Sequence, residues 1–347
     1  MERGSLMSSL TKTHIFFAGA TGYIGGSVLQ HLLDHPKRDT FQITALVRNV
    51  DKAKVLNTLG VNAVVASLLD FDNVTELVAA SNVVINTAES DNLDAIKAIL
   101  RGLKSHHDKT GEVPIYIHTS GTGVLVDNAA GLHDTDVVYV DINPETIESL
   151  PETAPHRSVD LAVVSADREG YARTYIVLPP TIFGIATGKL YDLGISNRHS
   201  IQIPIAIKAS LDRGQGGVIG EGKNTWPLVQ IHELAEFYKI LFDATLSDPS
   251  TPHGREGYYF AENGEYKLHD LAKTYSRVLY DLGKGRGPDP TPFTTEEAQK
   301  YFGGPWLGSN SRCKAVRARR LGWKPTRTTK DLLESVPPEV EAIILQK

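Results

Sequence analysis

Short apolar runs alternate with amphipathic segments through the first half of the chain. The runs are rich in β-branched and aromatic residues and span Ile15–Ala20, Gln42–Val47, Val61–Ala66, Val83–Ala88 and Pro114–Thr119. Apolar residues recur at helical spacing over Ile24–Leu33, Asp51–Leu59, Asn73–Ala80 and Leu93–His106. The runs are continuously apolar, as in strands that helices cover on both faces. The pattern predicts an α/β fold with a Rossmann-type, doubly wound parallel sheet.

The regular alternation ends near the middle of the chain. A helix at Arg157–Glu169 and a strand at Thr174–Leu178 are expected before Pro179 and Pro180 interrupt the pattern. Glycine and proline become frequent beyond Gly184, although helical spacing returns in several segments. We therefore predict a loose tail over residues 1–11 and a Rossmann domain over 12–184. A smaller capping lobe is predicted over 185–347, with segments at about 215–262 returning to the sheet.

Composition and charge narrow the class of protein. The 347 residues are 41% hydrophobic and 22% charged, which is typical of a folded globular chain. The formal net charge of −5 argues against a nucleic-acid-binding surface. The single cysteine, Cys313, excludes an intramolecular disulfide framework and a multi-cysteine metal site. No apolar run reaches the length of a membrane helix, and no signal peptide is recognisable, so we expect a cytoplasmic protein.

The most specific motif follows the first predicted strand and opens the first predicted helix. It reads Gly19-Ala20-Thr21-Gly22-Tyr23-Ile24-Gly25-Gly26. Gly19 permits a tight turn, Gly22 lets the backbone approach a pyrophosphate, and Gly25 allows close packing of helix on strand. The helix N-terminus offers free N–H groups and a partial positive charge to phosphates. The motif predicts dinucleotide binding.

Several segments resemble the extended and atypical short-chain dehydrogenase/reductases, both the epimerase/dehydratase-like and the NmrA-like branches. They include the glycine motif with its Gly-x-x-Gly-x-x-Gly spacing, Ala45–Arg48, Val84–Ala88, Ile117–Gly121 and Pro179–Gly184. The resemblance covers residues 13–184 well and reaches the second lobe weakly. It implies a pyridine-dinucleotide cofactor, a small-molecule substrate, and a homodimer paired through two helices of the sheet layer.

The end of the second predicted strand indicates which cofactor is preferred. An NAD site usually has Asp or Glu there, to accept a hydrogen bond from the ribose 2′-hydroxyl. This chain has Arg48, with Lys52 shortly after it. A guanidinium can hold a 2′-phosphate that a carboxylate would repel, so we expect NADP(H) to be preferred over NAD(H).

The resemblance also implies the remaining cofactor contacts. Leu68 or its neighbours are expected near the adenine. Asn86, Thr87 and Ala88 are expected beside the ribose groups, and Pro179, Ile182 and Phe183 near the nicotinamide. The full set of expected cofactor-binding residues is Gly19, Thr21, Gly22, Tyr23, Ile24, Gly25, Arg48, Lys52, Leu68, Asn86, Thr87, Ala88, Thr119, Pro179, Ile182 and Phe183. No metal site is predicted.

The catalytic pair of the resembled family is missing. Relatives use a Ser, a Tyr and a Lys four residues after that Tyr. Ser120 stands at the expected end of the fifth strand, but His156 aligns with the Tyr position and Asp160 with the Lys position. No lysine occurs between Lys109 and Lys189. The ordinary Tyr–Lys pair therefore cannot come from this interval.

Three substitutes remain open at this stage. His156 can donate a proton, because imidazole titrates near neutrality, or it can be an inert residue at a helix start. Asp160 can pair with His156 one helical turn away, or it can lie on a solvated helix face or pair with Arg157. Tyr139 can reach the substrate from the loop after Ser120, or its apolar neighbours can hold it as packing.

Three functions follow from these features. The first is an NADP(H)-dependent reductase or dehydrogenase that acts on a small carbonyl or alcohol with a non-standard proton donor. The second is a non-catalytic, NmrA-like dinucleotide-binding regulator or redox sensor, which keeps the glycine loop without the catalytic pair. A nucleotide-sugar epimerase or dehydratase is the third, and the missing Tyr–Lys pair counts most against it.

Overall fold

Seven parallel strands form the central sheet of the computed structural model, which describes residues 12–345. The expected N-terminal tail, residues 1–11, lies outside the described residues. The strand order is β11-β7-β5-β4-β1-β2-β3. The strands are β1 (Thr13–Ala18), β2 (Phe41–Val47), β3 (Asn62–Val65), β4 (Val83–Asn86), β5 (Ile115–Thr119), β7 (Arg173–Leu178) and β11 (Tyr258–Phe260).

The central strands are apolar throughout because both faces of the sheet are covered. Ile15, Phe16 and Phe17 of β1 are all fully buried, although alternate side chains point to opposite faces. In the parallel register, Phe17 lies opposite Ala45 of β2 and Ile85 of β4. The same pairing brings the carboxyl ends of these strands to one edge of the sheet.

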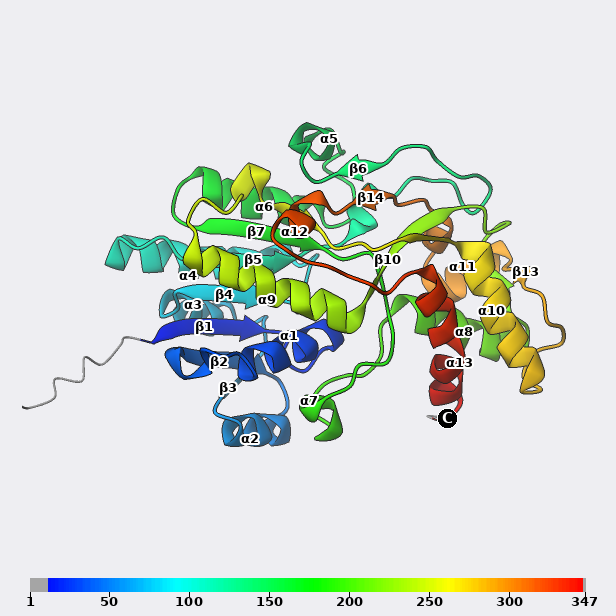
Figure 1. The fold of residues 1–347 in the computed structure, drawn as a ribbon, viewed down its shortest axis with the longest axis horizontal. Helices are drawn as coiled ribbons and strands as arrows, with labels where there is room; N and C mark the ends of the chain where they lie inside the picture. Colours follow the sequence, from blue (N-terminus) through cyan, green and yellow to red (C-terminus); the bar gives the residue numbers. More distant parts are fainter. Residues whose placement is uncertain (1–11, 346–347) are drawn as a thin grey trace, which may run out of the picture.

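Helices pack on both faces of this sheet (Figure 1). On one face α3, α4 and α6 lie against one another, and on the other α1 packs against α9. The helices are α1 (Tyr23–Leu33), α2 (Val50–Thr58), α3 (Phe71–Ala79), α4 (Leu93–Thr110), α6 (Arg157–Arg168) and α9 (Ile231–Ser247). The predicted doubly wound α/β fold is confirmed.

A second lobe follows the Rossmann sheet and has its own core. Its mixed sheet has the order β12-β10-β8, and Trp226, Leu228 and Tyr266 of this sheet are buried under the helices. The larger elements are β8 (Thr181–Phe183), β10 (Thr225–Gln230), β12 (Glu265–Lys267), α8 (Gln202–Arg213), α10 (Leu268–Asp281), α11 (Thr295–Phe302) and α13 (Thr329–Leu345).

Short elements complete the chain between these larger ones. β6 pairs with β14, and β9 pairs with β13, each as a two-stranded ladder. These elements are β6 (Tyr139–Val140), α5 (Pro144–Glu148), α7 (Lys189–Asp192), β9 (Gly217–Val218), β13 (Thr291–Pro292), β14 (Cys313–Lys314), α12 (Val316–Arg320), η1 (Arg38–Thr40), η2 (Thr122–Leu125), η3 (Gly254–Glu256) and η4 (Trp306–Gly308).

The strand order reverses between β1 and β4. The chain runs outward from β1 to β3, then crosses back to β4 and continues the other way. In sheets of this kind, ligands bind in the crevice outside the carboxyl ends of the strands at such a switch point. The glycine motif after β1 therefore opens directly onto this crevice.

Candidate functional site

The glycine-rich loop makes a turn that side chains would obstruct. Gly19 has φ +96°, and its carbonyl accepts a hydrogen bond of 2.8 Å from the Gly22 N–H. A Cβ at Gly25 would lie 2.0 Å from the Gly19 oxygen, so only glycine lets α1 pack this closely on the loop. The predicted roles of Gly19 and Gly25 in the turn and in packing agree with this geometry.

The first turn of α1 is open to an anion. Gly22 is the N-cap and makes no side-chain capping bond, and the first turn has no acidic residue. The first N–H groups of a helix have no carbonyl partner within it, and the helix dipole adds partial positive charge there. This cradle fits a dinucleotide pyrophosphate.

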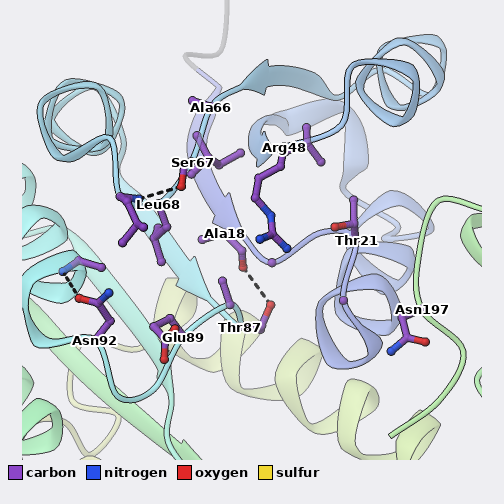
Figure 2. Close-up of a pocket in the computed structure, with 17 residues that line it drawn as sticks. Ala18, Thr21, Arg48, Ala66, Ser67, Leu68, Thr87, Glu89, Asn92 and Asn197 are labelled. Atoms are coloured by element: carbon purple, nitrogen blue, oxygen red, sulfur yellow. Dashed lines mark hydrogen bonds between the residues drawn. The ribbon is translucent and has the colours of Figure 1, made fainter. Parts of the chain in front are cut away.

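A cavity of about 520 Å³ lies beyond this loop at the carboxyl ends of β1 to β4. Figure 2 shows the side chains that surround it. The cavity brings together seven of the residues predicted from the sequence to hold the cofactor: Gly19, Thr21, Gly22, Arg48, Leu68, Thr87 and Ala88. Its size and lining fit the adenosine half of a dinucleotide.

Arg48 extends from the end of β2 toward the glycine-rich loop, as Figure 2 shows. It is exposed to solvent and has no hydrogen bond or ion pair with another residue of the described range. An unpaired guanidinium beside a pyrophosphate cradle suits a further phosphate group. Lys52, predicted to accompany it, lies on α2 and is not part of the cavity lining.

The predicted residues of α1 and β4 support the cavity rather than line it. Tyr23 is buried and its hydroxyl bonds the carbonyl of Gly184, while Ile24 packs in the core behind the loop. Asn86 is fully buried at the end of β4, where its side chain accepts a hydrogen bond from the Ala88 N–H at 3.1 Å. Asn86 thus shapes the turn that carries Thr87 and Ala88.

Thr119 and the residues expected near the nicotinamide lie outside this cavity. Thr119 is buried and bonds the hydroxyl of Tyr238 at 2.6 Å. The carbonyl of Pro179 accepts from the Thr122 N–H at 3.1 Å. Ile182 is half-buried, and Phe183 is buried in the core of the second lobe. Their roles in cofactor binding stay predictions.

Other lining residues were missed by the sequence analysis. Leu46, Val47 and Ala66 lie at strand ends beside Arg48 and Leu68. They could therefore have been predicted from their positions in the sequence. Asn197 comes from the second lobe, where no motif pointed to it. Further lining residues are Ala18, Ser67, Leu69, Glu89, Asn92 and Ala95.

Ser120 and Asp160 form a buried pair at the end of β5. The Ser120 hydroxyl donates to Oδ2 of Asp160 at 3.1 Å, and Asp160 is fully buried. Burial raises the pKa of the Asp160 carboxyl to about 7, against the lowering effects of the Ser120 hydrogen bond and of nearby Arg157. Asp160 therefore does not lie on a solvated helix face, and its side-chain hydrogen bond is to Ser120 rather than to His156.

His156 pairs instead with a residue from another loop. Its Nδ1 lies 2.7 Å from Oδ1 of Asp91, which follows β4. His156 is the N-cap of α6 and has φ +65°, an uncommon conformation for a non-glycine residue and a common one at functional sites. A Cβ at Gly121 or Gly123 would lie 3.3 or 3.0 Å from its Nε2, so these glycines make room for the ring just after Ser120.

Among the described residues, the Tyr139 side chain has no hydrogen bond to Ser120, Asp160 or His156, and its catalytic role stays a prediction. It lies in β6 opposite Cys313 of β14, and it lines a second, smaller cavity with Leu125 and Leu150. The residues that line this second cavity do not include Ser120 or His156. His118, beside them, is fully buried between Tyr116 and Asn86, and burial lowers its pKa to about 3.

Neither a metal site nor a membrane-spanning helix is found within residues 12–345. No cluster of His, Cys, Asp or Glu side chains in this range could hold a metal ion. No helix in it combines the length and apolar character needed to cross a bilayer.

This chain is similar to proteins that bind NAD(P)H. The sequence profile of a domain family described as NAD(P)H-binding matches residues 19–153. The chain is 30% identical over 337 residues to the oxidase ucsJ of Acremonium sp, covering 90% of this chain and 92% of the relative. It is 22% identical over 201 residues to a decarboxylating sterol-4-alpha-carboxylate 3-dehydrogenase of Dictyostelium discoideum, covering 53% and 58%. The UDP-glucuronic acid 4-epimerase of Bacillus cereus superimposes with a TM-score of 0.64 at 14% identity, covering 95% of this chain and all of that one.

Proposed function

The chain belongs to the extended and atypical short-chain dehydrogenase/reductases, as an NAD(P)-dependent oxidoreductase of that type, and we propose that it prefers NADP(H) and uses His156 as its proton donor. Its substrate in this proposal is a small carbonyl compound or the corresponding alcohol. Two relatives found by sequence are named an oxidase and a dehydrogenase, which supports redox chemistry.

Arg48 supports the preference for NADP(H). Its unpaired guanidinium extends from the end of β2 into the cavity beyond the glycine loop. A 2′-phosphate there would gain charge-assisted hydrogen bonds, whereas a 2′-hydroxyl would gain little. The pyrophosphate would be held by the backbone of Gly22 and the first turn of α1.

Bound NADPH would supply a hydride to the carbonyl carbon, and NADP+ would accept one in the reverse direction. In the forward direction the Ser120 hydroxyl turns from Asp160 to donate its hydrogen bond to the carbonyl oxygen, and His156 delivers the proton that converts this oxygen to a hydroxyl. The side chain of His156 keeps 20% of its surface exposed, so solvent can reprotonate it after each turnover.

The contact between His156 and Asp91 carries this proposal. With its Nδ1–H donating to Asp91, the imidazole presents Nε2 toward Gly121 and Gly123, immediately after Ser120. The carboxylate fixes the orientation of the ring. Asp91 is thus a positioning residue for a proton donor that stands where relatives have tyrosine.

The test measures oxidation of NADPH by a panel of small aldehydes and ketones. We expect His156→Asn to lower kcat by about 10²–10⁴-fold, the usual contribution of a general acid, while the Kd for NADPH stays unchanged. Asp91→Asn should lower kcat by a smaller factor. His269→Asn, an exposed histidine on α10, is the matched control and should retain full activity.

Two results would oppose the proposal. Full activity of His156→Asn would remove this residue from the chemistry. Saturable NADPH binding without oxidation by any panel member would favour the non-catalytic regulator instead, because binding would then be the whole function of the cofactor site.

A further inference from the structure

A second cavity, of about 290 Å³, is bounded by the segments that carry the proposed chemistry. One wall is η2 with Val124 and Leu125, which begins two residues after Ser120. Another wall runs from Leu150 to Pro155, the residue that precedes His156. The cavity therefore adjoins the backbone on which both Ser120 and His156 are mounted.

Most of the residues that line this cavity have apolar or aromatic side chains. Val124 and Leu125 are buried, with 1% and 5% of their surfaces exposed, and Leu150 and Pro155 face them from the other segment. Tyr139 of β6 adds an aromatic ring. A ligand here would exchange water for hydrocarbon over much of its surface.

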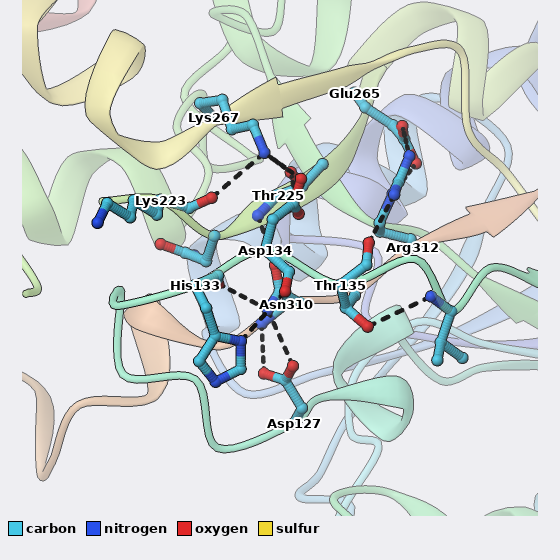
Figure 3. Close-up of polar contacts among 12 residues, drawn as sticks. Asp127, His133, Asp134, Thr135, Lys223, Thr225, Glu265, Lys267, Asn310 and Arg312 are labelled. Carbon is cyan, nitrogen blue, oxygen red and sulfur yellow. Dashed lines mark hydrogen bonds and ion pairs between the residues drawn. The ribbon is translucent and has the colours of Figure 1, made fainter. Parts of the chain in front are cut away.

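Charged groups at the cavity are already paired with other side chains. Among the described lining residues only Asp127 and Arg312 carry charge. Arg312 binds both carboxylate oxygens of Glu265, at 3.0 and 2.9 Å, and Asp127 accepts two hydrogen bonds from Asn310 (Figure 3). The lining thus has no unpaired cation to neutralise a diphosphate.

The outer wall is fixed before any ligand arrives. The N–H of Tyr139 donates to the Arg312 carbonyl at 3.0 Å within the β6–β14 pair. Asn310 also donates to the His133 carbonyl at 3.1 Å, and Asp134 binds Thr225 and pairs with Lys267, as Figure 3 shows. These bonds hold the loop between η2 and β6, so the cavity is preformed.

We propose that this cavity is the substrate subsite and that it takes the apolar chain of an uncharged carbonyl compound, not a nucleotide sugar. The inference rests on the proposed function, because it places the reacting carbonyl between Ser120 and His156 and the remainder of the substrate in the cavity. Apolar walls favour hydrocarbon, and Arg312, the only cation among the described residues that line the cavity, is already paired with Glu265.

The experiment compares 2-ketones from 2-butanone to 2-nonanone. In the wild-type protein kcat/KM should rise by about three- to four-fold for each methylene group that enters the cavity, until the cavity is full. Val137→Asp places a charge in the lining at a residue that is 57% exposed, so the variant should fold. It should raise KM for 2-nonanone at least about ten-fold at unchanged kcat, whereas Val137→Thr should raise it less.

A binding measurement separates this inference from the proposed function. Calorimetric titration of 2-nonanone into the protein saturated with NADP+ needs no turnover. Binding that Val137→Asp weakens, without turnover of any ketone, would support the cavity and overturn the oxidoreductase proposal. Turnover with no dependence on chain length and no effect of Val137→Asp would overturn the cavity alone. Competitive inhibition of ketone reduction by UDP-glucose would also overturn it.

Discussion

At the scale of single residues, the proposed preference for NADP(H) over NAD(H) depends on Arg48. We predict that Arg48→Ala weakens NADPH binding by about 10- to 100-fold, the usual range for hydrogen bonds to a charged group, and leaves NADH binding nearly unchanged. The fluorescence of the bound reduced cofactor measures both affinities. Lys54→Ala removes an exposed cation of α2 that pairs with Asp51, and it is the control. Equal losses for the two cofactors would show that Arg48 does not contact a 2′-phosphate.

Asp160 makes stability depend on pH. Its folded-state pKa of about 7 lies above the ordinary 3.8, so the folded state disfavours the ionised carboxyl. Stability therefore decreases as pH rises from about 4 to about 7 and then levels off. Asp160→Asn keeps an acceptor for Ser120 and removes the ionisation. The unfolding free energy of this variant minus that of the wild type should increase by up to about 4 kcal/mol as the pH rises from 4 to 8. Urea titrations measure this difference. Parallel pH profiles would contradict this.

Individual site residues could be predicted from the sequence where neighbouring residues define their position. Gly19, Gly22 and Arg48 could be identified because their spacing from a strand end fixes their place in the crevice. Asp91 could not, because the fold alone brings it to His156 across 65 residues of chain. Asp160 was placed correctly on a helix, but its burial depends on how α6 lies against β5.

At the scale of elements, the junction of β1 and α1 depends on glycine. A Cβ at Gly25 would also lie 2.5 Å from the Thr87 hydroxyl, so Gly25→Ala must push α1 away from the loop. We predict a loss of about 1–3 kcal/mol in unfolding free energy and a loss of NADPH binding. Thermal unfolding with and without NADPH tests both. Gly287→Ala, where the nearest atom to the new Cβ is 4.0 Å away, should change neither. Retained NADPH binding in Gly25→Ala would contradict the packing argument.

The Rossmann elements were predictable because their apolar runs are long and repeated. The strand β8 was not, since it has three residues and follows two prolines that normally end a strand pattern. The helix α11 was also missed, although Thr294 and Glu297 form a capping box that marks its start. Short elements of the second lobe gain their order from tertiary contacts, which local sequence does not encode.

At the scale of the whole molecule, the second lobe forms hydrogen bonds with the glycine-rich loop after β1. The Ser196 hydroxyl donates to the Ala20 carbonyl at 3.0 Å, and the Asn197 N–H donates to the Thr21 carbonyl at 3.1 Å. No local pattern could predict contacts across some 176 residues of chain. Because both lobes shape the same loop, a ligand bound there stabilises them together.

We therefore predict one cooperative thermal transition that NADPH shifts as a whole. A concentration of 100 times Kd should add about 2.7 kcal/mol to the unfolding free energy. Scanning calorimetry would show one peak that moves to higher temperature. Two peaks, of which NADPH moves only the first, would mean that the contacts of Ser196 and Asn197 do not couple the lobes.

Direct titration of the full chain with NADPH and with NADH tests the central claim, that the glycine cradle and Arg48 together form an NADP(H) site. We expect one saturable site per chain for NADPH and binding of NADH at least about ten-fold weaker, because one charge-assisted contact is lost. Equal affinities, or no saturable heat with either cofactor, would contradict it.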